Sequence, residues 1–205
     1  MSSQTVTVKN DTGTTNVRKM TMTGLLSAVA FLLMFFDFSV PLMPAFIKMD
    51  LSELPALIGS FAMGPVAGVV ICLIKNILHL MKTSTGGVGE LSNFILGAVF
   101  VFTAGIIYKK VNTRKGALIG SLAGAVVMAV VSIFSNYYLV YPVYTAFMPM
   151  EAIIAAYQAI NSNIRNLWQA LIVFNMPFTF VKAMFSVAIT FLVYKRISPV
   201  IKGNL

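Results

Sequence analysis

The sequence predicts an all-α integral membrane protein, a bundle of six transmembrane helices with both termini in the cytoplasm. Of its 205 residues 58% are hydrophobic and only 10% are charged, which is more apolar surface than a soluble domain of this length can bury. The apolar residues form long runs, and several of these reach the roughly 20 residues that a spanning helix needs. The basic residues gather at the ends of the runs.

This charge pattern predicts the topology. The chain has a net charge of +9, and most of its basic residues lie in three groups: Arg18 with Lys19, the 109–115 segment, and the stretch 195–202. Positive charge collects on the cytoplasmic side of membrane proteins, so we expect these groups inside the cell and no binding of nucleic acid. The lone Cys72 excludes an internal disulfide.

Span one is Met20 to about Phe36. Spans two and three depend on how the 51–82 stretch is interpreted. A single helix over 51–82 would be about 48 Å long at about 1.5 Å per residue, too long for a hydrocarbon core of about 30 Å. Gly64-Pro65 offers a break inside it, and two helices place the 109–115 cluster on the same side as the N-terminus. We therefore predict two short spans, the first extending back toward Ile47.

The remaining spans are bounded by charges and prolines. They are Leu91–Tyr108, Gly116 to about Leu139, and about Leu167 to Tyr194. Tyr141-Pro142 is expected to end span five, because the residue before a proline is disfavoured in a helix.

The connections and the tail complete this prediction. Three outer segments join the spans: 40–50, 83–90 and 141–166. Within the last of them, 151–160 predicts a short amphipathic helix at the membrane interface. Residues 1–16 are expected to form a flexible cytoplasmic tail, and 17–205 a single membrane domain.

Lys182 points most strongly to a function. It is the only charged residue between Arg165 and Lys195, near the middle of span six. A charge at mid-membrane costs at least about 2.5 kcal/mol and usually faces a cavity or a partner. Asn175, Thr179 and Ser186 share its helix face. Without the lysine these three would indicate a contact between helices, but with it they predict one wall of a pocket for a polar, aromatic solute.

Further polar residues are expected in the same extracellular half. Lys75 lies inside an apolar run and needs a partner, for which Glu53 is the candidate. His79 shares the helix face of Lys75 and fits a helix end near the interface. Asn93 near the start of span four and Asn136 near the end of span five complete a polar group that no single member would establish.

Two stripes of small residues predict close helix contacts. Gly116, Gly120 and Gly124 on span five indicate packing within the bundle. Gly24 and Ala28 form a similar pair on span one, whose other residues suit a lipid-facing helix. That pair predicts either internal packing or a docking face for a partner subunit.

The sequence does not indicate catalysis. It has one histidine, no metal-binding cluster of His and Cys, and no HExxH, GxSxG or GxxxxGK[ST] motif. We therefore expect neither an enzyme nor a bound cofactor or metal. Uphill transport would need an ion gradient or an ATPase partner.

Four segments resemble a known family: IKMDLSELPALIGSFAMGPVAGVVICLIKNILHLM (47–81), GGVGELSNFILG (86–97), SNYYLVYPVY (135–144) and PFTFVKAMF (177–185). They are similar to the riboflavin-specific substrate-binding subunit (S component) of energy-coupling-factor (ECF) transporters, the RibU family. The resemblance implies six helices in a bacterial plasma membrane and a riboflavin pocket near the outer surface, capped by the loop between spans one and two. It also implies a transmembrane coupling (T) subunit and two ATPase (A) subunits as partners, with the T subunit docking at Gly24 and Ala28.

The resemblance further implies the binding residues. Glu53, Asn136 and Lys182 match the acid, the asparagine and the lysine that contact the vitamin in the family. Thr179 stands where the family has a second asparagine, and Asn175, one turn earlier, is the candidate to replace its hydrogen bond. The full set expected to bind substrate is Glu53, Lys75, Asn93, Asn136, Asn175, Thr179 and Lys182.

The expected function is therefore capture of riboflavin from outside the cell for uptake driven by partner ATPases. Riboflavin is neutral, so a paired Glu and Lys can serve it, whereas FMN would need several unpaired cations. Two alternatives remain open at this point: an S component for FMN or another vitamin, and a stand-alone ion-coupled carrier that uses Lys182 or Glu53. A third, an intramembrane enzyme, would need a Ser/His or acid pair, and His79 has no nucleophile at a defined spacing.

Overall fold

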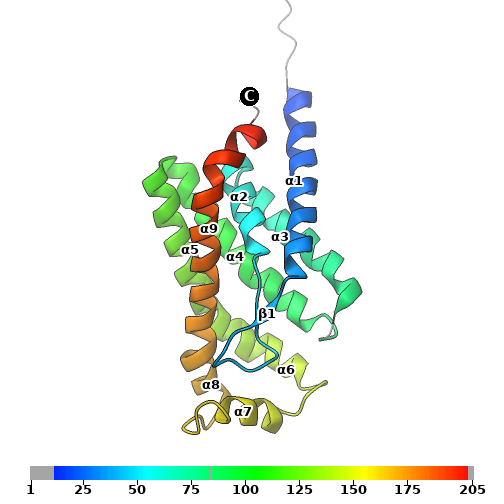
Figure 1. The fold of residues 1–205 in the computed structure, drawn as a ribbon, viewed down its shortest axis with the longest axis vertical. Helices are drawn as coiled ribbons and strands as arrows, with labels where there is room; N and C mark the ends of the chain where they lie inside the picture. Colours follow the sequence, from blue (N-terminus) through cyan, green and yellow to red (C-terminus); the bar gives the residue numbers. More distant parts are fainter. Residues whose placement is uncertain (1–11, 84, 203–205) are drawn as a thin grey trace, which may run out of the picture.

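The protein is built from long helices packed side by side, with short segments gathered at one end (Figure 1). The structure, a computed structural model, describes residues 12–83 and 85–202, so most of the tail predicted over 1–16 lies outside the described residues. Within these ranges, five helical stretches are long and apolar enough to cross a membrane. They are Asn16–Met34, Pro65–Lys82, Val88–Val111, Arg114–Tyr144 and Leu167–Tyr194.

These stretches comprise the following elements. The long helices are α1 (Thr12–Met34), α3 (Pro65–His79), α4 (Val88–Val111), α5 (Arg114–Ser135) and α9 (Met176–Lys202). The shorter elements that continue them are the 3₁₀ turn η1 (Leu80–Lys82), the π-helical turns η2 (Asn136–Val140) and η3 (Leu171–Asn175), and the short helices α6 (Tyr141–Tyr144) and α8 (Leu167–Ala170).

Gly64-Pro65 divides the 51–82 stretch, as predicted. Gly64 has φ 108°, a conformation that glycine adopts without strain, and Pro65 takes the first position of α3, where its missing N–H costs nothing. The preceding helix, α2 (Glu53–Met63), has 11 residues. The expected extension toward Ile47 was wrong, because residues 48–49 pair as a strand and Asp50 accepts a hydrogen bond from the Ser52 N–H just before the helix.

The expected end of span five was also wrong. The helix passes through Tyr141-Pro142 to Tyr144, because the turn before the proline is a π-helix: the Tyr141 N–H bonds to the Asn136 carbonyl, five residues back. The same turn precedes Pro177, where the Met176 N–H bonds to the Leu171 carbonyl. A proline removes a donor and crowds the carbonyl four residues back, and the wider π turn accommodates both effects.

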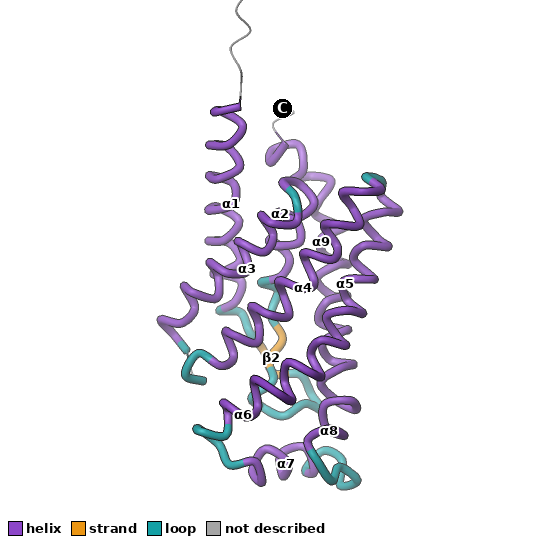
Figure 2. The backbone as a smooth tube through the Cα atoms, turned by 180° about the vertical axis from the view of Figure 1, so that it is seen from behind, coloured by secondary structure: helices purple, strands orange, loops and turns teal. Residues whose placement is uncertain are grey.

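The two ends of the bundle differ in character. The start of α1, the end of α9 and the loop between α4 and α5 lie at one end (Figures 1 and 2). The basic groups at these positions therefore share one end of the molecule, which fits the predicted charge pattern. The opposite end carries the helix α7 (Met150–Gln158). A two-residue antiparallel pair, β1 (Phe38–Ser39) with β2 (Lys48–Met49), lies between that end and the middle of the bundle (Figures 1 and 2). The pair was not predicted, whereas α7 matches the helix predicted over 151–160.

The small-residue stripes differ in their surroundings. A Cβ added at Gly120 or Gly124 would lie 2.7 Å from the carbonyl oxygen of Ala104 or Phe100 on α4, so the predicted packing within the bundle is confirmed there. Gly24 has nothing within 4 Å of its Cβ position, and Ala28 is exposed too. Within the described residues, then, the span-one pair makes no close internal packing contact.

Candidate functional site

A cavity of about 390 Å³ lies in the half of the molecule that holds β1 and β2. Its wall comes from α2, α4, α9, the η2–α6 region and the loop between α1 and α2. The volume falls in the range of about 300–1,000 Å³ typical of pockets for small molecules. All the residues predicted to bind substrate line this cavity except Lys75.

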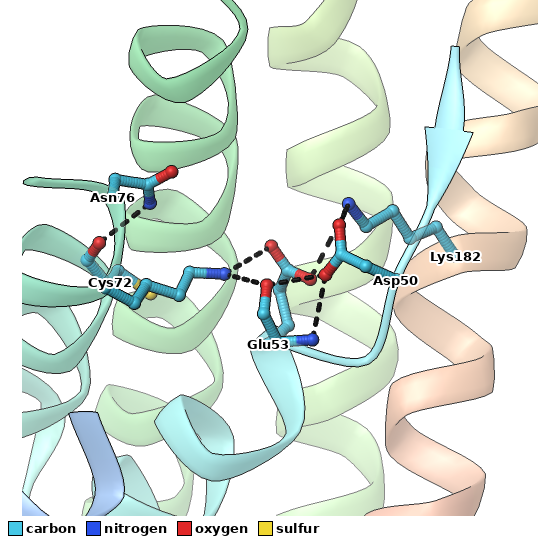
Figure 3. A network of polar contacts seen from close by, with 7 residues as sticks. Asp50, Glu53, Cys72, Asn76 and Lys182 are labelled. Carbon is cyan, nitrogen blue, oxygen red and sulfur yellow. Dashed lines mark hydrogen bonds and ion pairs between the residues drawn. The ribbon is translucent and has the colours of Figure 1, made fainter. Parts of the chain in front are cut away.

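Two lysines and two carboxylates form one buried network at the inner wall. Lys182 Nζ donates to Asp50 Oδ2 at 2.8 Å and lies 3.7 Å from Glu53 Oε2. Figure 3 shows Asp50 and Glu53 next to Lys182 on α9, and the second lysine, Lys75 on α3, bonds to Glu53. Each lysine is neutralised by a carboxylate, because unpaired buried charges would destabilise the fold.

Lys75 completes the network on the side that does not line the cavity. It is 0% exposed, donates to Glu53 Oε1 at 3.0 Å and also bonds to the Ser52 hydroxyl. The predicted pairing of Lys75 with Glu53 is therefore confirmed. Lys75 does not line the cavity, so it can act on the cavity only through its bond to Glu53.

Asp50 is the member that sequence reasoning missed. Its Oδ1 accepts from the Ser52 N–H at 2.8 Å and from the Ser52 hydroxyl at 2.5 Å. Burial opposes its charge, but the nearby Lys182 and Lys75 and the hydrogen bonds from Lys182 and Ser52 outweigh that effect and hold the pKa of Asp50 well below its usual value. The carboxylate is thus ionised, and it ties the α1–α2 loop to α9.

The cavity presents two buried acceptors without a donor. Glu53 Oε2 and Asn93 Oδ1 have no hydrogen-bond partner among the described residues. Buried polar atoms are normally paired, because leaving one unpaired costs about 1–3 kcal/mol. Both residues line the cavity, which makes their side chains candidate acceptors for hydroxyl donors.

The cavity is also lined by two further amides, those of Asn136 and Asn175. Asn136 Oδ1 accepts from the Ser92 hydroxyl at 3.4 Å, which leaves its NH₂ group available. Asn175 Oδ1 accepts from the Tyr157 hydroxyl at 2.6 Å. Thr179 and Lys182 follow on the same helix face. Asn175, Thr179 and Lys182 are each at most 8% exposed. Ser186 is also buried but does not line the cavity.

Apolar and aromatic side chains fill the rest of the wall. They are Met34, Phe46, Ile47, Leu96, Met128, Val140, Tyr141, Tyr144 and Phe178. A slot of this kind with a few fixed polar groups suits a flat ring with polar edges.

The rim of the cavity is charged but internally paired. Lys48 bonds to Asp37 at 2.7 Å beside the strands. His79 Nδ1 lies 2.8 Å from Glu90 Oε1, and Thr83 donates to the other oxygen of Glu90 at 3.0 Å. Each lysine in the lining therefore already has a carboxylate partner. The described residues contain no group of His, Cys, Asp and Glu able to hold a metal ion.

Comparisons with known proteins agree with one another. The profile of the family described as "ECF transporter, substrate-specific component" matches residues 18–194. The riboflavin transporter FmnP of Bacillus subtilis (strain 168) is 31% identical over 186 residues, which cover 89% of this chain and 93% of that protein. The riboflavin transporter RibU of Staphylococcus aureus (strain TCH60) is 31% identical over 179 residues, 87% of this chain and 89% of that protein.

A solved structure has the same fold. It is described as the S component of a bacterial ECF transporter and superimposes with a TM-score of 0.71 at 29% sequence identity. The match covers 91% of this chain and 99% of that one.

Proposed function

Because the chain belongs to the family of substrate-specific components of ECF transporters, we propose that it captures riboflavin at the outer face of a bacterial plasma membrane. A coupling subunit and two ATPases would then drive release of the vitamin inside. The riboflavin transporters of B. subtilis and S. aureus, each 31% identical, support the choice of substrate. No catalytic step is required of this chain.

One observation carries the proposal beyond its relatives: the cavity is lined by two acceptor residues whose buried oxygens lack a hydrogen-bond donor, Glu53 and Asn93, and by the two amides Asn136 and Asn175. The ribityl hydroxyls would donate to Glu53 and Asn93, each of which has a buried oxygen without a hydrogen-bond donor. The amide N–H groups of Asn136 and Asn175 would donate to the carbonyl edge of the isoalloxazine ring. Thr179 and Lys182 lie beside them on α9, and Lys75 contributes by holding Glu53.

The same electrostatics favour riboflavin over FMN. Lys48 and Lys182 line the cavity, and each is paired with an aspartate. The Lys182–Asp50 pair is buried, and a phosphate that broke it would lose more than it gained, whereas the exposed Lys48–Asp37 pair would cost little to break. We therefore expect FMN to bind more weakly than riboflavin.

The proposal includes the topology. α2 would be the sixth membrane helix although it has only 11 residues, and the loop of residues 35–52 would fill the remaining depth. Both termini would lie in the cytoplasm together with the basic 109–115 segment. Gly24 and Ala28 on the open face of α1 would contact the coupling subunit.

Two measurements test this function. Protein purified from cells grown with riboflavin should be yellow and absorb near the flavin bands, and a colourless protein that takes up no flavin would contradict the substrate. Radiolabelled riboflavin uptake should stop when the ATPase subunits carry inactivating substitutions. Uptake that continues without ATPase activity and follows the membrane potential would instead indicate a stand-alone ion-coupled carrier.

A further inference from the structure

The helix α7 contributes a buried tyrosine next to the cavity. Ile153 and Tyr157 are both 0% exposed, although α7 lies in the outer connection and not in a candidate span. Tyr157 does not line the cavity. Its hydroxyl lies 2.6 Å from Asn175 Oδ1 and 2.6 Å from the Tyr141 hydroxyl, so it touches two residues that do.

These three residues form a closed ring of hydrogen bonds. Tyr157 donates its only hydroxyl proton to Asn175 Oδ1, so Tyr141 must be the donor between the two tyrosines. Tyr141 in turn accepts from Asn175 Nδ2 at 3.4 Å. All three bonds therefore point the same way around the ring, an arrangement in which each bond strengthens the next.

The ring fixes how Asn175 can meet a solute. Asn175 is 6% exposed and lines the cavity. With its oxygen engaged by Tyr157 and one N–H by Tyr141, the group that remains for a solute is the second amide N–H. A reversed amide would donate to Tyr157 and accept from Tyr141, because each phenol can donate or accept, so the ring holds the side chain in place in either orientation. Burial raises the pKa of the Tyr157 phenol, so the donor proton stays in place at physiological pH.

Tyr157 also supports the loop above the cavity. The rings of Phe46 and Tyr157 lie 6.0 Å apart in an edge-to-face contact, and the Phe46 ring lies 6.0 Å from that of Tyr144. Phe46 belongs to the segment that lines the cavity from the α1–α2 connection. The tyrosine thus contacts both the loop and the amide.

We propose that Tyr157 is a positioning residue for substrate recognition: it holds the Asn175 side chain at the cavity wall, where the amide group that the ring leaves free can bond to the polar edge of a flavin ring. This inference rests on the proposed function for the identity of the solute. It also assigns a role to the 141–166 connection, whose helix holds a binding residue in place. The alternative is that Tyr157 only stabilises the fold.

A double-mutant cycle distinguishes these roles. In riboflavin titrations followed by fluorescence quenching, Tyr157→Phe and Asn175→Ala should each weaken binding about tenfold. The double variant should bind no more weakly than Asn175→Ala alone, because Tyr157 acts through that amide. Tyr138→Phe, which removes a hydroxyl from a tyrosine that is 71% exposed, is the matched control and should bind like the wild type. Additive losses in the double variant would overturn the proposal.

A second readout does not depend on the ligand. In protein labelled with ¹⁵N-asparagine, the Asn175 side-chain NH₂ signals are those missing from Asn175→Ala. They should exchange slowly with solvent in the wild type and rapidly in Tyr157→Phe. Equal exchange in the two proteins would overturn the positioning role even if riboflavin binds. Slow exchange in a wild type that binds no flavin would keep the role of Tyr157 and refute the proposed function.

Discussion

At the scale of single residues, the buried charges mark one wall of the cavity. Lys182 marked the cavity from the sequence alone, because an isolated charge in an apolar helix needs a partner. Its partner Asp50 was missed because it lies 132 positions away in a loop, where no periodicity pointed to it. Pairing the buried charges one by one could have found it. If Glu53 pairs with Lys75, Lys182 still needs an acidic partner, and Asp50 lies three residues before Glu53.

Lys182→Ala should weaken riboflavin binding at least about tenfold, or about 1.4 kcal/mol. The substitution leaves Asp50 without its donor and Glu53 Oε2 without the nearby cation. Fluorescence titration measures the change, and Lys110→Ala, an exposed lysine at the opposite end of the bundle, is the control. An unchanged affinity would remove Lys182 from the site.

Asp50→Asn should lower stability by about 3–5 kcal/mol at neutral pH, because it breaks a buried ion pair from one side. The pKa of Asp50 is depressed in the folded protein. The contribution of Asp50 to stability is therefore present above its ordinary pKa of 3.8 and lost as the pH falls below that value. Thermal melts should show a constant difference between wild type and variant from about pH 8 to pH 5, shrinking below about pH 4. A difference that already shrinks at pH 6 would contradict the ionised pair.

At the scale of elements, the helices were predictable and their irregular turns were not. Hydropathy and the Gly64-Pro65 pair placed the spans and the break between α2 and α3. The π turns at 136–140 and 171–175 escaped because a proline in an apolar run also fits a helix end, and only tertiary packing decides between the two. Each π turn includes a cavity asparagine, Asn136 or Asn175, in keeping with the frequent use of π turns at functional sites.

Pro142→Ala should weaken riboflavin binding several-fold without lowering the melting temperature. Alanine restores a donor that can bond to the carbonyl four residues back, which favours a regular α-helix and shifts Asn136 relative to the cavity. Titration and thermal melts on the same preparation separate the two effects. A variant with unchanged affinity would show that packing, not the proline, maintains the π turn.

At the scale of the whole molecule, the cavity lies in one half and one face of α1 is open. The charge pattern predicted that the N-terminal helix, the α4–α5 loop and the end of α9 would lie together, and they do (Figure 1). The pattern could not predict the path of the 35–52 loop, because its pairing with α9 and its contact with α7 join parts of the chain that are far apart in sequence. The membrane side of each end stays a prediction.

Cysteine labelling of intact cells tests the topology. Native Cys72 is 0% exposed, so the wild type should react little with a membrane-impermeant maleimide. Asn163→Cys in the outer connection should be labelled, whereas Asn112→Cys between α4 and α5 should be labelled only after the cells are opened. The reverse pattern would invert the proposed orientation.

Ala28→Leu should spare riboflavin binding and block uptake, if α1 docks the coupling subunit. Ala28 is exposed on the same face as Gly24, so leucine there fills no internal space but prevents a close approach of helices. Val126→Leu on α5, 48% exposed, is the control and should affect neither property. Normal uptake by Ala28→Leu would move the docking face elsewhere.

The most direct measurement for the account as a whole is a titration of the purified wild-type protein with riboflavin, followed by quenching of flavin fluorescence and repeated with FMN. We predict saturable one-to-one quenching by riboflavin and weaker binding of FMN, because each lysine in the cavity wall is already paired with a carboxylate. Binding of FMN as tight as that of riboflavin would contradict a site whose lysines are already paired. No quenching by either flavin would contradict the proposed substrate.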